Sequence, residues 1–135
     1  MLSALVLLAQ STGPLDVAGT WRIPPEEEGG PDRGVVEIVM EDGAPVGRVV
    51  RIGEAIEDTE AARGVLGTKI VWGFERDEDD GEWDDGKIRD PEADRTYDAK
   101  MRRQGEALSV EGCVLFICRE QVWLPAPQPD VAPAP

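Results

Sequence analysis

Apolar and polar side chains alternate with a period of two through most of the sequence between residues 34 and 124. In Gly34–Glu41, apolar residues such as Ile38 alternate with charged ones. Asp42-Gly43 follows as a turn signal, and Val46–Ile52 continues with a second apolar run. A period of two places apolar groups on one face of a strand, so these segments predict a hairpin with one buried face.

The same alternation predicts further half-buried strands. Ile70 and Trp72 share a face in the first of these strands, and Tyr97 and Met101 share a face in the second. In the last strand Arg119 shares a face with Gln121 and Trp123. The predicted strands are Thr68–Arg76, Arg95–Arg103, Ala107–Cys113 and Cys118–Leu124.

The helical signal is weak. Glu54–Arg63 contains good helix formers but only one large apolar side chain, Ile56, so we expect a surface loop or a single short helix. Short strands with one apolar face each need two packed sheets or one closed sheet. The sequence therefore predicts an all-β fold, a small antiparallel barrel of roughly eight strands with at most one short helix.

Composition restricts the function. The chain has 135 residues, which is the usual size of one domain. Its formal charge of −14 disfavours nucleic acid and anionic lipid as partners. The sequence contains no His, which removes Ser-His and Cys-His dyads and His-ligated zinc. Ser109 lies on a predicted strand without a base, so we expect no catalytic residues, no cofactor and no enzymatic activity.

Both ends of the chain differ from the central region. Residues 1–11 contain an apolar run, Leu2–Ala9, that is too short to span a bilayer, and Ala9-Gln10-Ser11 fits a signal peptidase site. A signal peptide is expected here, with an N-terminal strand or buried helix as the alternative. Residues 125–135 hold five prolines and predict a disordered tail. The domain is thus expected over residues 12–124.

An acidic run, Glu75–Asp85, has eight carboxylates and one Arg. Calcium loops of the EF-hand type need Asp at positions one, three and five before a Gly at six. Counting back from Gly81 or Gly86 does not give this frame. A solvated hairpin tip is therefore expected in preference to divalent-cation binding, and no metal ligands are predicted.

Ordered motifs give a resemblance to a known family. Together they resemble the domain-of-unknown-function family 2147 of secreted bacterial proteins, over Leu15 to Leu124. This resemblance implies an exported, lipocalin-like or calycin-like antiparallel barrel in a family without an established reaction. The motifs are Gly19-Thr20-Trp21, Trp83-x-x-Gly86-x-Ile88-x-Asp90-Pro91, Thr96-Tyr97-x-Ala99-Lys100, Gly112-Cys113 and Cys118-Arg119-x-Gln121-x-Trp123.

Gly19-x-Trp21 also resembles the opening motif of lipocalins, in which a basic side chain from the last strand covers the Trp ring. Arg119 is the predicted partner of Trp21, and this barrel-closing pair would be structural because an indole face attracts a guanidinium. Trp83 and Trp123 are expected to pack in the core.

Cys113 and Cys118 raise a question of geometry. Five residues of continuous strand would hold them about 16 Å apart, beyond the roughly 7 Å limit for a disulfide. A bridge therefore requires a turn, expected as a four-residue loop over Val114–Ile117, whereas two buried thiols in one strand are the alternative. The exported compartment and the resemblance favour the disulfide.

Two functions are compatible with these features. The first is periplasmic or secreted binding of a small hydrophobic or amphipathic ligand inside the barrel. The second is a ligand-free structural or interaction module of the cell envelope, without a membrane span in the mature chain. The predicted wall of the ligand site consists of Ile38, Ile70, Trp72, Tyr97, Met101 and Val110.

Overall fold

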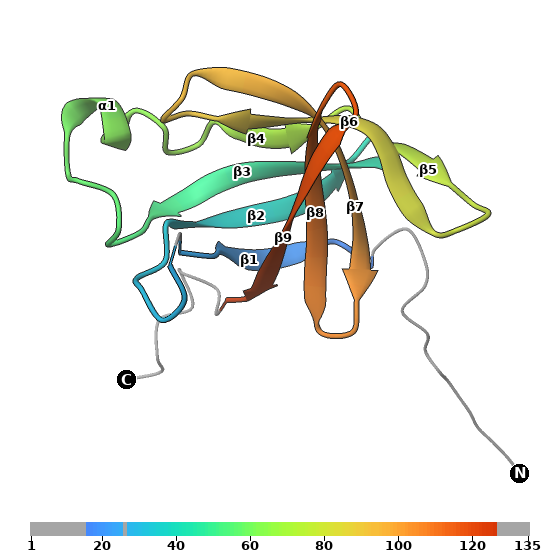
Figure 1. Ribbon diagram of the computed structural model, residues 1–135, viewed down its shortest axis with the longest axis horizontal. Coiled ribbons are helices and arrows are strands. Elements are labelled where there is room, and N and C mark those ends of the chain that lie inside the picture. The colour runs from blue at the N-terminus through green and yellow to red at the C-terminus, as the bar shows by residue number, and fades with distance from the viewer. Residues whose placement is uncertain (1–15, 26, 127–135) are drawn as a thin grey trace, which may run out of the picture.

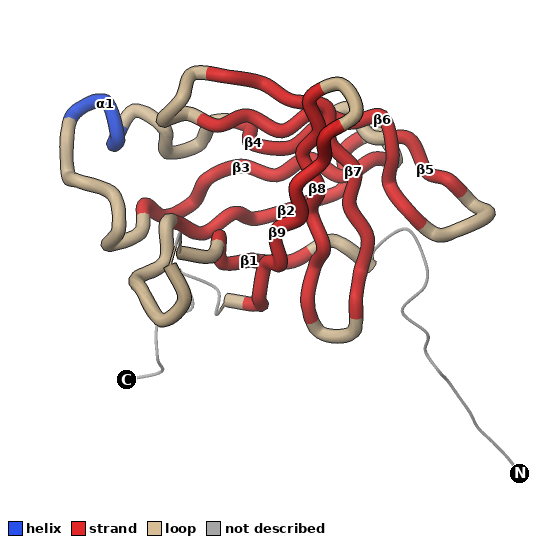
Figure 2. Tube along the Cα trace, viewed as in Figure 1, coloured by secondary structure: helices blue, strands red, loops and turns tan. Residues whose placement is uncertain are grey.

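A computed structural model describes residues 16–25 and 27–126 (Figure 1). These residues form one antiparallel sheet of nine strands and one short helix (Figure 2). The elements are β1 (Gly19–Ile23), β2 (Gly34–Glu41), β3 (Ala44–Ile52), α1 (Glu60–Arg63), β4 (Lys69–Trp72), β5 (Glu75–Asp77), β6 (Glu82–Asp90), β7 (Arg95–Gln104), β8 (Ala107–Val114) and β9 (Ile117–Pro125).

The sheet closes on itself. Its strand order is β4-β3-β2-β1-β9-β8-β7-β6-β5, and β4 also pairs with β6 through Val71 and Ile88. Eight strands thus form a closed barrel, and β5 extends β6 at one end. The predicted all-β barrel of roughly eight strands is confirmed. Closure removes the unpaired strand edges that an open sheet would expose.

Most predicted strands are present. β2 has the predicted bounds, and Asp42 and Gly43, both at positive φ, form the turn to β3. Within Glu54–Arg63 only the last four residues are helical, with Thr59 as the N-cap, in line with the expected short helix. None of the α1 residues is buried, so tertiary packing adds little to the stability of this helix.

Residues 68–90 differ in part from the expectation. The single strand expected over Thr68–Arg76 is divided at Gly73, whose φ of +81 redirects the chain between β4 and β5. The acidic run forms a hairpin, as expected, but only residues 78–81 are its tip, because its first three residues form β5 and its last four begin β6. Acidic side chains hid this strand, but Trp83 is buried within it and Gly86 gives room to the ring of Phe74.

The two ends of the barrel differ. Trp21, Trp83 and Met101 belong to the hydrophobic core at one end, and all three are nearly inaccessible to solvent. At this end the β5–β6 hairpin lies on the right of Figure 1, whereas α1 and the β6–β7 turn lie on the left. We call the first the closed end and the second the open end.

The described residues include the end of the last strand but only part of the two predicted terminal segments. β9 continues to Pro125, opposite Trp21, and the N–H of Ala126 donates to Thr20 O. The expected signal peptide over residues 1–11 and the tail beyond residue 126 lie outside the described residues. Within the described part of the chain, no helix is long and apolar enough to cross a membrane.

Candidate functional site

A cavity of about 850 Å³ occupies the open end of the barrel. Its wall includes residues from all eight barrel strands, and the segment around α1 covers one side. The inner wall is largely aliphatic, whereas several rim residues are exposed, so the cavity opens to solvent. The aliphatic wall residues include Ile23, Val49, Ile52, Ile56, Val65, Ile70, Ile88 and Val110.

Three of the six predicted wall residues line this cavity, namely Ile70, Tyr97 and Val110. Ile38 and Met101 do not line it, because they are buried deeper, among the core residues of the closed end. Trp72 does not line the cavity either. Its side chain is half-buried and lies outside both the core cluster and the cavity wall. The turn at Gly73 ends β4 directly after Trp72, so the expected face is not continued.

Charged side chains surround the rim of the cavity. Arg33 pairs with Glu92 at 2.9 Å, and Arg89 pairs with Asp94. Glu57 and Asp90 also belong to the lining. These rim residues were not predicted, because they come from separate loops and from the end of β6 and meet only in the folded barrel.

Two further arginines at the rim are available to a ligand. Arg95 begins β7 and Arg119 lies on β9, and both are exposed and line the cavity. Within the described residues neither side chain makes a hydrogen bond or an ion pair. A guanidinium presents several donors in a fixed geometry that suits a carboxylate or phosphate. The rim could therefore hold the polar group of a ligand.

The closed end contains a different cation than the sequence predicted. Arg103, not Arg119, covers the Trp21 ring, with 5.4 Å from the guanidinium carbon to the ring centroid. Arg119 cannot reach it, because Trp21 pairs with Pro125 in β9 and Arg119 lies six residues farther along that strand, about 20 Å away. The sequence contains a signal for Arg103, because the alternation along β7 places it on the same inward face as Tyr97 and Met101.

Hydrogen bonds hold this end in place. The indole Nε1 of Trp21 donates to Val17 O at 3.0 Å. Arg103 donates to Asp16 O at 2.8 Å and to Gly105 O at 2.7 Å. These hydrogen bonds fasten the segment before β1 across this end of the barrel.

A second cation covers a second indole. The guanidinium carbon of Arg76 lies 5.2 Å from the centroid of Trp83, and Arg76 also pairs with the buried carboxylate of Asp16 at 3.5 Å. The two arginine–tryptophan contacts share Asp16, through its carbonyl and its carboxylate. The sequence analysis missed Arg76 and Arg103 because the relevant contacts join distant strands.

An acidic cluster lies in the β5–β6 hairpin. Ligand oxygens of Asp77, Asp80 and Asp84 lie within 4.8 Å of one another. Burial raises the pKa of Asp84 to about 6, and the charges of Glu82 and Asp80 add to this effect. Asp77 and Asp80 already accept backbone N–H groups within the turn. Mutual repulsion and partial desolvation are the main physical properties of this cluster.

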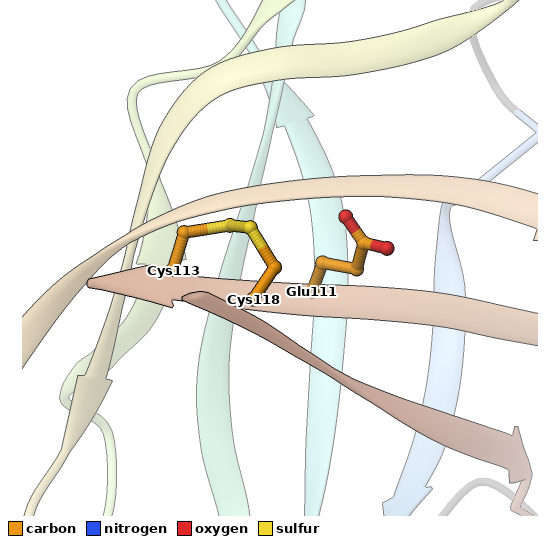
Figure 3. A group of neighbouring side chains, drawn as sticks. All are labelled: Glu111, Cys113 and Cys118. Atoms are coloured by element: carbon orange, nitrogen blue, oxygen red, sulfur yellow. A yellow bond between two sulfur atoms is a disulfide. The ribbon is translucent and has the colours of Figure 1, made fainter. Parts of the chain in front are cut away.

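Cys113 and Cys118 form a disulfide, as predicted, with a Cα–Cα distance of 4.0 Å (Figure 3). They pair across β8 and β9 on the outer face of the barrel, on the same side as Glu111. The oxidised sulfurs provide no thiolate, so this trio is not a metal site. The expected four-residue loop was wrong: Val114 pairs with Ile117, which leaves a two-residue turn with Leu115 at φ +57.

The groups considered for catalysis are engaged in structural contacts. Ser109 is buried, and its hydroxyl donates to the carboxylate of Glu120 on the neighbouring strand. This hydrogen bond joins β8 to β9 and is a structural contact of Ser109.

Comparison with known proteins agrees with this geometry. Residues 19–124 match the family described as "Uncharacterized protein conserved in bacteria (DUF2147)". No curated protein matches the sequence significantly. Among solved structures, protein HP1028 from the human pathogen Helicobacter pylori, described as belonging to the lipocalin family, is similar with a TM-score of 0.61 and 9% identity. The match covers 85% of this chain and 86% of that chain, and it shows a lipocalin-like fold.

Proposed function

The chain belongs to the DUF2147 family of bacterial proteins, and on the basis of its cavity we propose that it binds one small, partly apolar ligand. The observation that carries this proposal is the volume of about 850 Å³ at the open end. Ligand pockets usually enclose about 300–1,000 Å³, and a barrel of eight strands has room for one small ligand.

The lining indicates the chemistry of the ligand. Aliphatic side chains such as Val49 and Ile70 favour an apolar body. The guanidinium groups of Arg95 and Arg119 at the rim favour a carboxylate or phosphate at the other end of the molecule. An amphiphile with one acidic group therefore fits this cavity best.

We propose a binding role in preference to catalysis. The whole sequence lacks His, and the hydroxyl of Ser109 is committed to Glu120. The alternative of a ligand-free envelope module draws support from the filled core around Trp21 and Trp83. The filled core lies at the closed end, whereas our proposal rests on the cavity at the open end.

The compartment is also part of the proposal. An exported protein would be consistent with the disulfide, since such bonds persist in oxidising compartments, and with the apolar run Leu2–Ala9. Mass spectrometry of the protein from its native cell should find a mature chain beginning near Thr12. A cytoplasmic protein that retains Met1 would contradict export.

Ligand binding can be tested with a fluorescent anionic amphiphile, anilinonaphthalene sulfonate, and with long-chain carboxylates as competitors. Gly112→Leu fills the cavity, because Gly112 lines it and a Cβ there would meet Ile88 at an ordinary 3.4 Å. Thr96→Leu is the control, since Thr96 is exposed and lies outside the lining. We expect saturable binding by the native protein and the control, and a loss of at least about tenfold in Gly112→Leu.

The competitors separate the alternatives. Arg95→Gln combined with Arg119→Gln should weaken long-chain carboxylates more than the matching neutral alcohols. Equal affinity of Gly112→Leu and the native protein would exclude the cavity as the site. A native protein that binds neither carboxylates nor alcohols would favour the ligand-free module.

A further inference from the structure

The β8–β9 turn presents four consecutive apolar side chains to solvent. We call Val114–Ile117 the apolar tip; its residues are 51%, 86%, 95% and 70% exposed in chain order. The turn lies at the upper edge of the molecule in Figure 2. Single exposed apolar residues are common on proteins, but a contiguous group of this kind marks an interaction site.

The turn itself is not optimal for stability. Leu115 has a φ of +57, a conformation that Gly or Asn adopts at much lower cost than Leu. Its side chain is almost fully exposed and gains little from burial. Folding thus does not account for leucine at this position, and an unfavourable conformation that persists is grounds for a functional hypothesis.

The tip is rigid and uncharged over a defined depth. Cys113 and Cys118 join the two strands directly below Val114 and Ile117, so little conformational freedom remains to be lost on binding (Figure 3). The nearest carboxylates on these strands are the cross-strand pair Glu111 and Glu120. At about 3.3 Å per residue they lie about 10 Å below Val114 and Ile117, and the nearest charged residue, Arg119, lies about 7 Å below Ile117.

From these features we infer that the apolar tip inserts into the interfacial region of a lipid bilayer. Apolar groups of surface-bound segments enter that region to a depth of about 5–10 Å, which matches the uncharged part of the hairpin. A tip of four residues is much smaller than a stable protein interface, which uses about 20–30 residues on each side. Backbone groups of the turn remain near lipid headgroups and water, so they stay hydrogen-bonded.

The position of the tip relative to the cavity supports a membrane as the partner of the tip. Val114 and Ile117 line the cavity rim, so insertion of the tip would place the opening against the membrane surface. The acidic hairpin lies at the other end of β6, away from that surface. The charge of −14 opposes attraction to anionic lipid, so the apolar side chains supply the affinity and zwitterionic lipid suffices.

The experiment measures binding of the full chain to vesicles of palmitoyl-oleoyl phosphatidylcholine by flotation. The test variant is Leu115→Asn combined with Phe116→Ser, which removes apolar surface while Asn suits the positive φ. Leu66→Ser is the matched control, since Leu66 is an exposed leucine in the loop after α1. We expect partition to fall at least about tenfold in the tip variant and to stay unchanged in the control.

A direct reporter complements the comparison of variants. Phe116→Trp places an indole at the most exposed position of the tip. On addition of vesicles its emission should shift to the blue, and lipids brominated on the acyl chains should quench it. Residues 1–11 are the same in all variants, so a difference in vesicle binding between two variants reports the tip alone.

Four results would overturn the inference. The first is equal flotation of the tip variant and the native chain, and the second is Phe116→Trp emission that vesicles do not change. The third is a concentration-dependent dimer by sedimentation equilibrium that the tip variant abolishes, which would assign the tip to a second copy of the chain. Binding only to vesicles containing phosphatidylglycerol would likewise contradict an apolar mechanism.

Discussion

The guanidinium of Arg103 on β7 lies over the ring of Trp21 on β1, two strands that are not neighbours in the sheet. The contact therefore spans the barrel at its closed end. Together with the bonds from Arg103 to the carbonyls of Asp16 and Gly105, it fastens the segment before β1 to the opposite wall.

Arg103→Ala should lower the free energy of unfolding by about 1–3 kcal/mol, because it removes a cation–π contact and two hydrogen bonds to carbonyls. Arg119→Ala is the control, since Arg119 is exposed and lies far from Trp21, and it should change stability by less than about 0.5 kcal/mol. Urea unfolding followed by tryptophan fluorescence measures both. A larger loss in Arg119→Ala would favour the pairing that the sequence predicted.

Asp84 should make stability depend on pH. Because its pKa is raised to about 6 by burial and neighbouring charges, the folded state binds the proton more tightly than the unfolded chain. The contribution of Asp84 to stability therefore falls as the pH rises from about 4 to about 6.

Asp84→Asn removes this unfavourable charge. It should raise the free energy of unfolding at pH 7.5 by about 1–2 kcal/mol after allowance for solvent screening, and the gain should shrink towards pH 4. Asp79→Asn changes the same formal charge at the exposed turn and should have an effect within about 0.5 kcal/mol. Equal gains in both variants would show that net charge, and not burial of Asp84, is responsible.

The acidic hairpin should not bind calcium tightly. Calcium takes six to eight oxygen ligands, whereas this cluster contains three aspartates, two of which already accept backbone N–H groups. Calorimetry at physiological ionic strength should show no saturable binding in the micromolar range. A one-to-one micromolar isotherm that Asp77→Asn and Asp80→Asn abolish would establish a cation site here.

The disulfide should add modestly to stability. It closes a loop of only a few residues, so replacing Cys113 and Cys118 together by Ser should cost roughly 2 kcal/mol. Titration of the denatured, unreduced protein with a thiol reagent should find no free thiol at these positions. Two reactive thiols per chain would show that the bridge is absent.

Gly86 should tolerate no side chain. A Cβ at this position would lie 2.2 Å from Cδ1 of Phe74, whose ring is buried against the strand. Gly86→Ala should therefore destabilise the fold by about 1–3 kcal/mol through displacement of the ring. Gly64→Ala, where the nearest atom is 3.4 Å away and φ is negative, should leave stability nearly unchanged in the same thermal unfolding assay.

The sequence by itself determined the fold class and the faces of most strands. Alternation identified β2, β7, β8 and β9, since each strand buries one face and a period of two shows which one. It failed for β6, where carboxylates next to Trp83 hide the alternation and a bulge interrupts the register. The disulfide needed the resemblance as well, because spacing alone left two thiols as an alternative.

Only the tertiary structure decided where inward-facing residues lie along the barrel axis. Ile70 and Ile38 have the same signature in the sequence, yet one lines the cavity and the other fills the closed end. Arg103 and Arg119 are likewise both inward-facing, at opposite ends of the barrel. The physical reason is that alternation specifies a face, whereas depth in the barrel depends on the register of every strand against its neighbours around the closed sheet.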